Sequence, residues 1–214
     1  EKLREEGEKG KSVVMINGAG NPERVVSVVV LRATDSRGRV FAQLGTLDAD
    51  GVHTSCQLPG GKQEQGELTM ESLKRILQAK LEPLAGSVEI TGTQRKVEWN
   101  LSREYGIQTK YLRTICSARL EQPVERSQCH LMSVTEGAMF DVSREIRNSI
   151  QTRTPFAVAG KDREVLFAWL WEEELRHLSS AAGEADATWW LHAIAQNRES
   201  VVALQPRPRQ DKPS

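Results

Sequence analysis

A glycine-rich loop followed directly by an amphipathic helix, in residues 58–84, is the feature that most constrains the fold of this chain. Gly60, Gly61 and Gly66 interrupt regular structure and let the backbone approach a ligand closely. Behind the loop, apolar residues recur at the spacing of one buried helical stripe, namely Leu73, Ile76, Leu77, Leu81 and Leu84. We therefore predict a helix that buries this stripe and is stopped by Pro83.

The loop and the start of the helix resemble the Nudix box. That signature is a Gly, five residues, a Glu, seven residues, and then Arg-Glu-apolar-x-Glu-Glu-x-Gly-apolar. Gly61, Glu67 and Arg75 occupy its first three positions without a gap, and Leu77 occupies the apolar position. The three helix carboxylates of the family fall on other residue types here, namely Ile76, Ala79 and Lys80.

Positions 76, 79 and 80 share one face of a helix, because successive residues are rotated by about 100°. Three carboxylates on that face would bind Mg²⁺ or Mn²⁺, which prefer oxygen ligands. The ions would neutralise a diphosphate and activate water for attack on it. Ile76 and Ala79 supply no oxygen ligand, and the ammonium group of Lys80 repels a cation. The sequence therefore predicts a degenerate box without catalytic residues, bound metal or other cofactor.

The resemblance implies an α/β (α+β) fold, a Nudix-like α/β/α sandwich with a mixed β-sheet. Our first hypothesis is a non-hydrolytic module that binds a nucleotide or phosphate ligand, or that acts as a scaffold for protein partners within a larger chain or assembly. The glycine loop and the helix N-terminus would receive a phosphate through backbone N–H groups. The predicted ligand-binding residues are Gly60, Gly61, Lys62, Arg75 and Lys80.

A second hypothesis retains hydrolysis. Glu64, Glu67 and Glu71 lie beside the missing triad and would serve as relocated ligands for Mg²⁺ or Mn²⁺. The resemblance would then imply nucleoside diphosphates linked to another group as substrates. Residues 172–174 are three further glutamates that would fold toward the same place, although capping of a helix N-terminus also accounts for them. The sequence leaves enzymatic activity open, and the missing triad favours the first hypothesis.

Composition excludes some classes of function. Lys plus Arg and Asp plus Glu both number 29, so the neutral chain is not expected to bind nucleic acids generally. Its apolar runs all fall short of the roughly 20 residues that a membrane helix needs. Cys56, Cys116 and Cys129 share no metal-binding spacing, and their odd number favours a reducing, intracellular compartment over a disulfide framework. Because the chain begins at Glu1 rather than Met, we expect an excised or processed piece.

Three segments are predicted from composition. Residues 1–11 form a charged arm, residues 12–202 the Nudix-like domain, and residues 203–214 a polar, Pro-rich tail. Within the domain, residues 121–160 show the least regular pattern and are predicted to be an insertion.

Strands are expected where Val-rich or alternating stretches lie between turn residues. We expect residues 24–33 to pair antiparallel with residues 39–47, and residues 87–91 to form a hairpin with residues 94–101 around Gly92. The other predicted strands are residues 12–17, 52–58, 106–120 and 165–171, and the other predicted helices are residues 142–150, 172–175 and 187–200.

Overall fold

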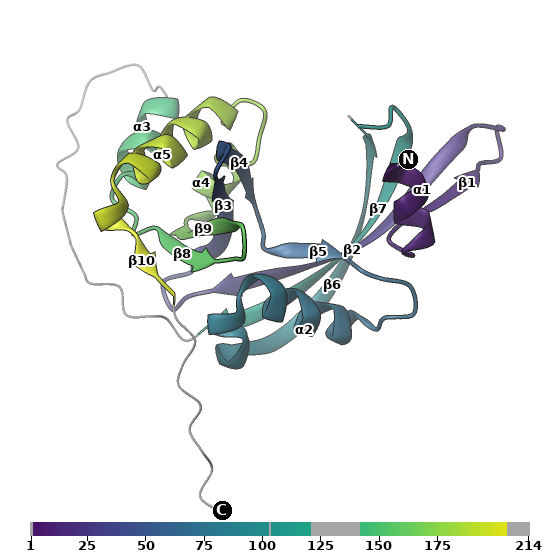
Figure 1. Cartoon of the computed structure of the whole chain (residues 1–214), viewed down its shortest axis with the longest axis horizontal. Helices are drawn as coiled ribbons and strands as arrows, with labels where there is room; N and C mark the ends of the chain where they lie inside the picture. Colours follow the sequence, from purple (N-terminus) through teal and green to yellow (C-terminus); the bar gives the residue numbers. More distant parts are fainter. Residues whose placement is uncertain (1, 103, 121–141, 205–214) are drawn as a thin grey trace, which may run out of the picture.

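The computed structural model describes residues 2–102, 104–120 and 142–204. Across these residues the chain forms one ten-stranded mixed sheet with helices on both of its faces (Figure 1). Its main path has the order β10-β8-β9-β3-β2-β7-β6, with β1 and β5 paired to β2 and β4 paired to β3. The predicted α+β class with a mixed sheet is confirmed.

The elements alternate along the chain much as the hydrophobic pattern indicates. The strands are β1 (Val13–Ile16), β2 (Pro22–Thr34), β3 (Val40–Asp48), β4 (Gly51–Gln57), β5 (Gly60–Lys62), β6 (Val88–Leu101), β7 (Gln108–Leu120), β8 (Phe156–Ala159), β9 (Arg163–Leu170) and β10 (Val202–Ala203). The α-helices are α1 (Lys2–Glu8), α2 (Thr69–Lys80), α3 (Val142–Ile150), α4 (Glu172–Leu178) and α5 (Glu184–Gln196), and η1 (Glu82–Ser87) and η2 (Arg198–Ser200) are 3₁₀ helices.

Two hydrophobic cores lie on opposite faces of the sheet, because successive side chains of a strand point to opposite sides. On β3, Phe41 belongs to the core under α2, whereas Val40 and Ala42 belong to the core under α3, α4 and α5. Strand β9 divides in the same way, with Trp169 in the first core and Leu170 in the second. This two-sided covering makes the fold an α/β/α sandwich.

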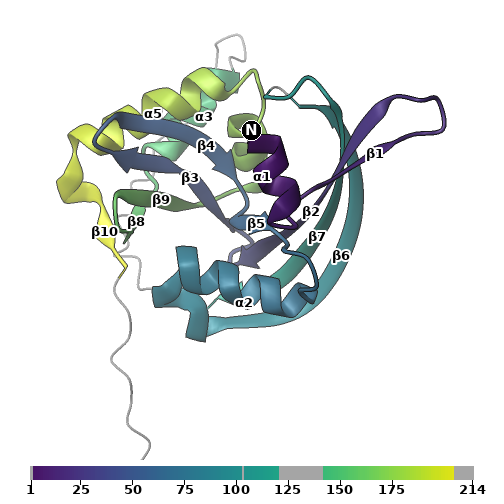
Figure 2. The same cartoon turned by 45° about the vertical axis from the view of Figure 1, so that its right-hand side comes forward.

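The Val-rich strand β2 lies at the centre of the sheet. It pairs in parallel with β7 along twelve register positions, from Glu23 opposite Gln108 to Thr34 opposite Arg119. Burial on both faces explains why its sequence is a nearly continuous apolar run rather than an alternation. Figure 2 shows β7 and β6 curving beside β2, while the hairpin of β1 and β2 projects from the body of the fold.

The pairing of β2 with β3 is antiparallel, as predicted, but it is confined to the turn. Thr34 opposite Val40 is its one register pair. Strand β3 pairs instead with β9 and β4, because β7 on one side and β1 and β5 on the other occupy the hydrogen-bonding edges of β2. The predicted partner of residues 24–33 is therefore wrong over most of the strand.

The predicted hairpin around Gly92 is also wrong. Strand β6 runs without a break from Val88 to Leu101 and pairs with β7 along its length. The register shifts between Ile90 and Gly92, which marks a β-bulge at the glycine. A glycine inside a strand pattern accommodates such a bulge as readily as it starts a turn.

The predicted stripe is buried, but α2 carries only part of it. Leu73, Ile76 and Leu77 lie on α2, Leu81 is its C-terminal cap, and Leu84 lies in η1; all five are at most 7% exposed. The α-helix ends at Lys80, and Pro83 lies in the following 3₁₀ helix η1 rather than at the end of α2 itself.

The predicted segments are placed as follows. Helix α1 lies in the charged arm, and β10 crosses the boundary predicted at residues 202–203. Helix α3 and strand β8 lie within residues 121–160, and Ile150 and Phe156 are both fully buried. Residues 121–141, with Cys129, and residues 205–214 lie outside the described residues. Among the described helices, none is both long and apolar enough to cross a membrane.

Candidate functional site

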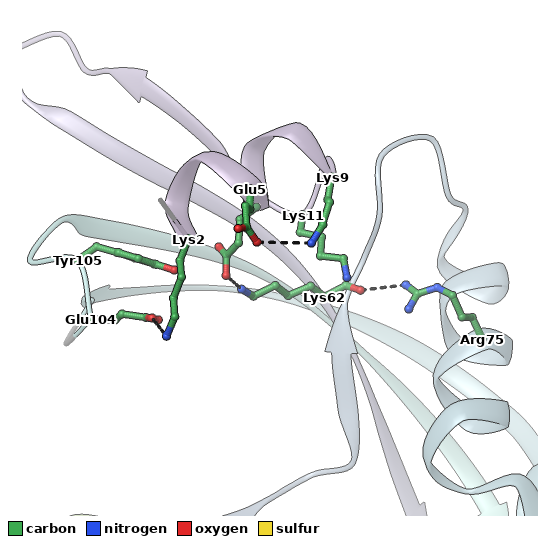
Figure 3. Close-up of a pocket in the computed structure, with 9 residues that line it drawn as sticks. Lys2, Glu5, Lys9, Lys11, Lys62, Arg75, Glu104 and Tyr105 are labelled. Atoms are coloured by element: carbon green, nitrogen blue, oxygen red, sulfur yellow. Dashed lines mark hydrogen bonds and ion pairs between the residues drawn. The ribbon is translucent and has the colours of Figure 1, made fainter. Parts of the chain in front are cut away.

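A cavity of about 520 Å³, which we call the basic cavity, lies between α1, β5, α2 and the loop after β6 (Figure 3). Lys62 and Arg75, two of the predicted ligand-binding residues, line it from β5 and α2. The arm contributes three further cations, so that five basic side chains meet around one opening. The complete lining is Lys2, Glu5, Glu6, Lys9, Lys11, Lys62, Arg75, Glu104 and Tyr105.

Arg75 is held in place by Glu67. The guanidinium Nε donates to Glu67 Oε1 at 2.5 Å, and Nη2 donates to Oε2 at 2.7 Å. Arg75 Nη2 also donates to the backbone carbonyl of Lys62 at 3.0 Å, which ties α2 to β5. Hydrogen bonds from Arg75 and Ser72 lower the pKa of Glu67 to about 2. Glu67 is therefore an ionised carboxylate whose oxygens are used to orient Arg75.

The two other candidate carboxylates of the relocated-ligand hypothesis face different partners. Glu64 lies 3.4 Å from the ammonium of Lys11 and 3.9 Å from Arg75 Nη1. Glu71 accepts a hydrogen bond from the backbone N–H of Leu68 at 2.9 Å, which caps the start of α2. In the part of the chain that the structure describes, no three acidic, histidine or cysteine side chains are arranged to hold a metal ion.

Positions 76, 79 and 80, at which the Nudix signature has carboxylates, lie in three different environments. Ile76 is 3% exposed and lies in the core under α2, whereas Ala79 is exposed. The ammonium of Lys80 donates to the carbonyl oxygen of Gly60 at 2.6 Å. Burial, with a smaller contribution from the positive charge of Arg163, lowers the pKa of Lys80 below its ordinary value. Lys80 therefore joins the end of α2 to the glycine loop and does not line the basic cavity.

Packing requires a glycine at position 60 and leaves little room for a side chain at position 61. A Cβ on Gly60 would lie 2.6 Å from the carbonyl oxygen of Val29 and 2.6 Å from Cγ1 of Val30. A Cβ on Gly61 would lie 3.2 Å from Cγ1 of Ile76. The close approach expected at these glycines is thus made by β2 and α2, and neither glycine lines the basic cavity.

Sequence reasoning missed the residues that hold the arm against the sheet. The carboxylate of Glu6 accepts hydrogen bonds from Arg24 on β2 and from Lys62 on β5. The side chain of Arg24 is 3% exposed, and its guanidinium lies 5.1 Å from the ring centre of Tyr105. An arginine inside a Val-rich strand was the available signal, because a buried charge requires a partner.

The glutamates after β9 cap a helix and pair with arginines. Glu174 accepts a hydrogen bond from the backbone N–H of Trp171 at 2.7 Å. It also forms an ion pair with Arg153 at 2.7 Å. Glu172 pairs with Arg32 at 2.7 Å. These contacts fit the capping interpretation of residues 172–174.

A second surface feature lies on the projecting part of the sheet. Residues paired across neighbouring strands point to the same face of the sheet. Val97 on β6 is paired with Leu112 on β7, and both point to the face that α2 covers elsewhere in the sheet. Trp99 is 49% exposed on this face, with the ammonium of Lys110 5.0 Å from its ring centre. Six exposed apolar side chains lie on this face, and we call them the apolar strip: Val13, Met15, Val97, Trp99, Leu101 and Leu112.

No model of a known protein family matches the sequence, and no curated protein matches it. Solved structures similar to the chain include the MutT protein from Methanosarcina mazei Go1, with 13% identity, a TM-score of 0.35, and coverage of 50% of this chain and 73% of that chain. A Nudix hydrolase from Nitrosomonas europaea has 14% identity and a TM-score of 0.33 over 59% of this chain and 78% of its own. The Nudix hydrolase RenU from M. smegmatis has 13% identity and a TM-score of 0.33 over 88% and 98%.

Proposed function

We propose that this chain is a non-hydrolytic, Nudix-like module that binds a nucleotide or another phosphate compound in the basic cavity. The observation that carries the proposal is the meeting of Lys62 and Arg75, from the glycine loop and α2, with Lys2, Lys9 and Lys11 from the arm around one opening. Lysine and arginine bind phosphate oxygens through charge-assisted hydrogen bonds. Arg75 is already oriented by Glu67, so its ordering costs little when a ligand binds.

The absence of hydrolysis in this proposal is supported by the structural contacts that the side chains at and beside the box positions make. Ile76 packs in the core, Lys80 bonds the glycine loop, and Glu67 holds Arg75. Recruiting these positions to a metal would break contacts that position α2. The binding module leaves these contacts in place, whereas the relocated-ligand hydrolase would have to break them.

Isothermal titration calorimetry with ADP and with inorganic pyrophosphate tests binding directly. We expect both probes to bind the wild-type chain, and the double variant Lys9→Gln/Lys11→Gln to bind them about tenfold more weakly, because charged hydrogen bonds are removed. The matched control is Lys161→Gln, an exposed lysine outside the cavity. Equal affinities for all three proteins, or no binding at all, would contradict the proposal.

A hydrolysis assay separates the module from the relocated-ligand enzyme. Phosphate release from nucleoside diphosphate derivatives is measured with Mg²⁺ and with Mn²⁺, for the wild type and for Glu64→Gln/Glu67→Gln/Glu71→Gln. The module is expected to show no turnover with either ion. Metal-dependent turnover that the triple variant abolishes would replace our proposal with the hydrolase.

The apolar strip favours a second candidate function, contact with another copy of this chain. Within residues 2–102, 104–120 and 142–204, β6 is the last strand of the sheet order and no further strand pairs with its outer edge, which can therefore accept one. In an antiparallel pairing centred on Val97, Lys96 of each copy would lie opposite Glu98 of the other, and the two strips would extend each other. Charge complementarity thus points to a second copy as the occupant.

Sedimentation velocity at increasing protein concentration tests this second candidate. We expect a dimer that Trp99→Ser weakens and that Lys96→Glu weakens further, since the latter places glutamates opposite each other. Lys161→Gln again serves as the surface control. A monomer at every concentration, or a dimer unaffected by both strip variants, would exclude this contact.

A further inference from the structure

The carboxylate of Glu6 is bound by two cations that belong to the sheet. Arg24 of β2 and Lys62 of β5 both donate hydrogen bonds to it, and the hydroxyl of Ser12 donates at 3.3 Å. The Glu6 side chain is only 19% exposed. Burial acts to raise the pKa of Glu6, but the hydrogen bonds from Lys62 and Arg24 outweigh it and lower the pKa below its ordinary value. The arm therefore inserts an ionised acid between two cations of the domain.

Arg24 has donor capacity that Glu6 does not use. Its side chain is 3% exposed, and its Nε finds no hydrogen-bond partner among the described residues. The centre of the Tyr105 ring lies 5.1 Å from the guanidinium, within the range of a cation–π contact. A phosphate group has more acceptor oxygens than a carboxylate, and a guanidinium donates to phosphate in a bidentate manner. The buried arginine is thus suited to a larger anion than the one it holds.

Helix α1 is weakly attached apart from Glu6. It is seven residues long and has no buried residue, and helices this short are not stable alone in water. Its other contacts with the domain include the ion pair of Lys2 with Glu104, at 3.1 Å, in which both side chains are more than half exposed. Exposed ion pairs of this kind contribute little stability. Loss of the Glu6 contact would therefore release the helix.

We propose that Arg24, which lies behind Glu6, and Lys62, which lines the basic cavity, form a phosphate-binding subsite at the edge of this cavity, and that Glu6 occupies this subsite in the free protein as a competitor within the chain. The inference rests on the proposed function, since it names the groups that receive the phosphate and the contact that regulates access to them. A ligand phosphate replaces the Glu6 carboxylate, bonds Arg24 and Lys62, and displaces α1 together with Lys2. The rest of the ligand is bound by Arg75 on α2 and by the two lysines that follow α1, Lys9 and Lys11.

The consequence for affinity follows from the population of the open form. Apparent affinity falls in proportion to the fraction of protein in which the site is open. If the form closed by Glu6 outnumbers the open form by about ten to one, removal of the Glu6 charge tightens binding about tenfold. Displacement also predicts that ligand binding loosens α1 instead of ordering it.

Calorimetric titration of Glu6→Gln with pyrophosphate and with ADP is the first test. We expect about tenfold tighter binding than in the wild type. The matched control is Glu8→Gln, on the same helix, which pairs with Arg4 at the surface and does not line the cavity. An equal gain for both probes supports a site for the phosphate group itself, and a gain for ADP alone supports a site for phosphate carried by a nucleoside.

Hydrogen exchange of the amides of residues 2–8 is the second readout. We expect pyrophosphate to accelerate this exchange in the wild type, and Glu6→Gln to show fast exchange without ligand. Adding Lys62→Gln to Glu6→Gln should abolish the gain in affinity. Lys62 is 35% exposed, so this variant is expected to fold where a change at the buried Arg24 would endanger the fold.

The two proposals fail in different ways. If the wild type binds pyrophosphate but Glu6→Gln binds it equally well, with unchanged exchange of α1, the competitor role of Glu6 is wrong and the proposed function stands. If neither the wild type nor Glu6→Gln binds either probe, the proposed function is wrong and the inference is wrong with it.

Discussion

Gly60 is the first residue of β5 and lies close to the backbone of its partner strand β2. Its ideal Cβ position lies 2.6 Å from the carbonyl oxygen of Val29, which is backbone and cannot move aside like a flexible side chain. In the sequence this glycine looks like part of a ligand-binding loop, and the structure gives it a packing reason instead. A substitution there acts first on stability.

We predict that Gly60→Ala destabilises the protein by about 1–3 kcal/mol, the usual cost of forcing extra volume into a packed site. The matched control is Gly86→Ala, because a Cβ at Gly86 meets no atom within 4 Å. Urea unfolding at neutral pH measures both variants. Equal midpoints for the two alanine variants would show that β5 can move away from β2.

At the scale of the element, α2 packs the stripe residues Leu73, Ile76 and Leu77 against the sheet. Ile76 lies in the core and Ala79, three residues later, is exposed. Two positions that carry carboxylates in the Nudix signature thus sit in different environments here. Introducing glutamate at position 76 and, separately, at position 79 therefore shows how strongly burial of the position determines the loss of stability.

We predict that Ile76→Glu destabilises the protein by about 3 kcal/mol or more, because it removes buried apolar volume and places a carboxyl group in the core. Ala79→Glu, on the exposed side, is expected to stay within about 0.5 kcal/mol of the wild type. Thermal unfolding followed by circular dichroism compares the two. Tolerance of Glu at position 76 would mean that this face of α2 opens to solvent.

For the whole molecule, Asp186 connects the helices over the second core. This residue of α5 is 1% exposed and contacts Arg147 of α3 at 2.6 Å and His177 of α4 at 2.7 Å, and Ser143 of α3 donates a further hydrogen bond. Burial acts to raise the pKa of Asp186, but the hydrogen bonds from Ser143, His177 and Arg147 lower it to about 2. One carboxylate therefore joins three helices that are separate in sequence.

We predict that Asp186→Asn destabilises the fold by about 2 kcal/mol at pH 7, because it removes charge-assisted hydrogen bonds from a buried carboxylate whose partner Arg147 is itself 42% exposed. Because the pKa is lowered on folding, the contribution of Asp186 is present above its ordinary value of 3.8 and is lost as the pH falls toward 2. The variant should therefore lose less stability than the wild type between pH 4 and pH 2. Asp50→Asn, at an exposed turn, is the control, and parallel acid-unfolding curves would contradict the assignment.

Elements with a local signal could be predicted from the amino-acid sequence alone. The stripe from Leu73 to Leu84 repeats with the period of a helix, and the run from Arg24 to Ala33 has the Val density of a central strand. The helical period predicts the buried face of α2, whereas the burial of β2 on both faces is known from the structure. The motif positions Arg75 and Lys62 were also recognisable, and the structure brings both to the basic cavity.

Strand pairing and long-range ion pairs depend on the folded arrangement of the whole chain. The parallel pairing of β2 with β7 joins residues more than 80 positions apart, and no local pattern specifies it. Gly92 shows the same limit, because a glycine permits either a bulge or a turn until its partner strand is known. A buried arginine such as Arg24 needs a negatively charged partner. The fold places the arm beside β2 and β5, so that the Glu6 carboxylate pairs with both Arg24 and Lys62.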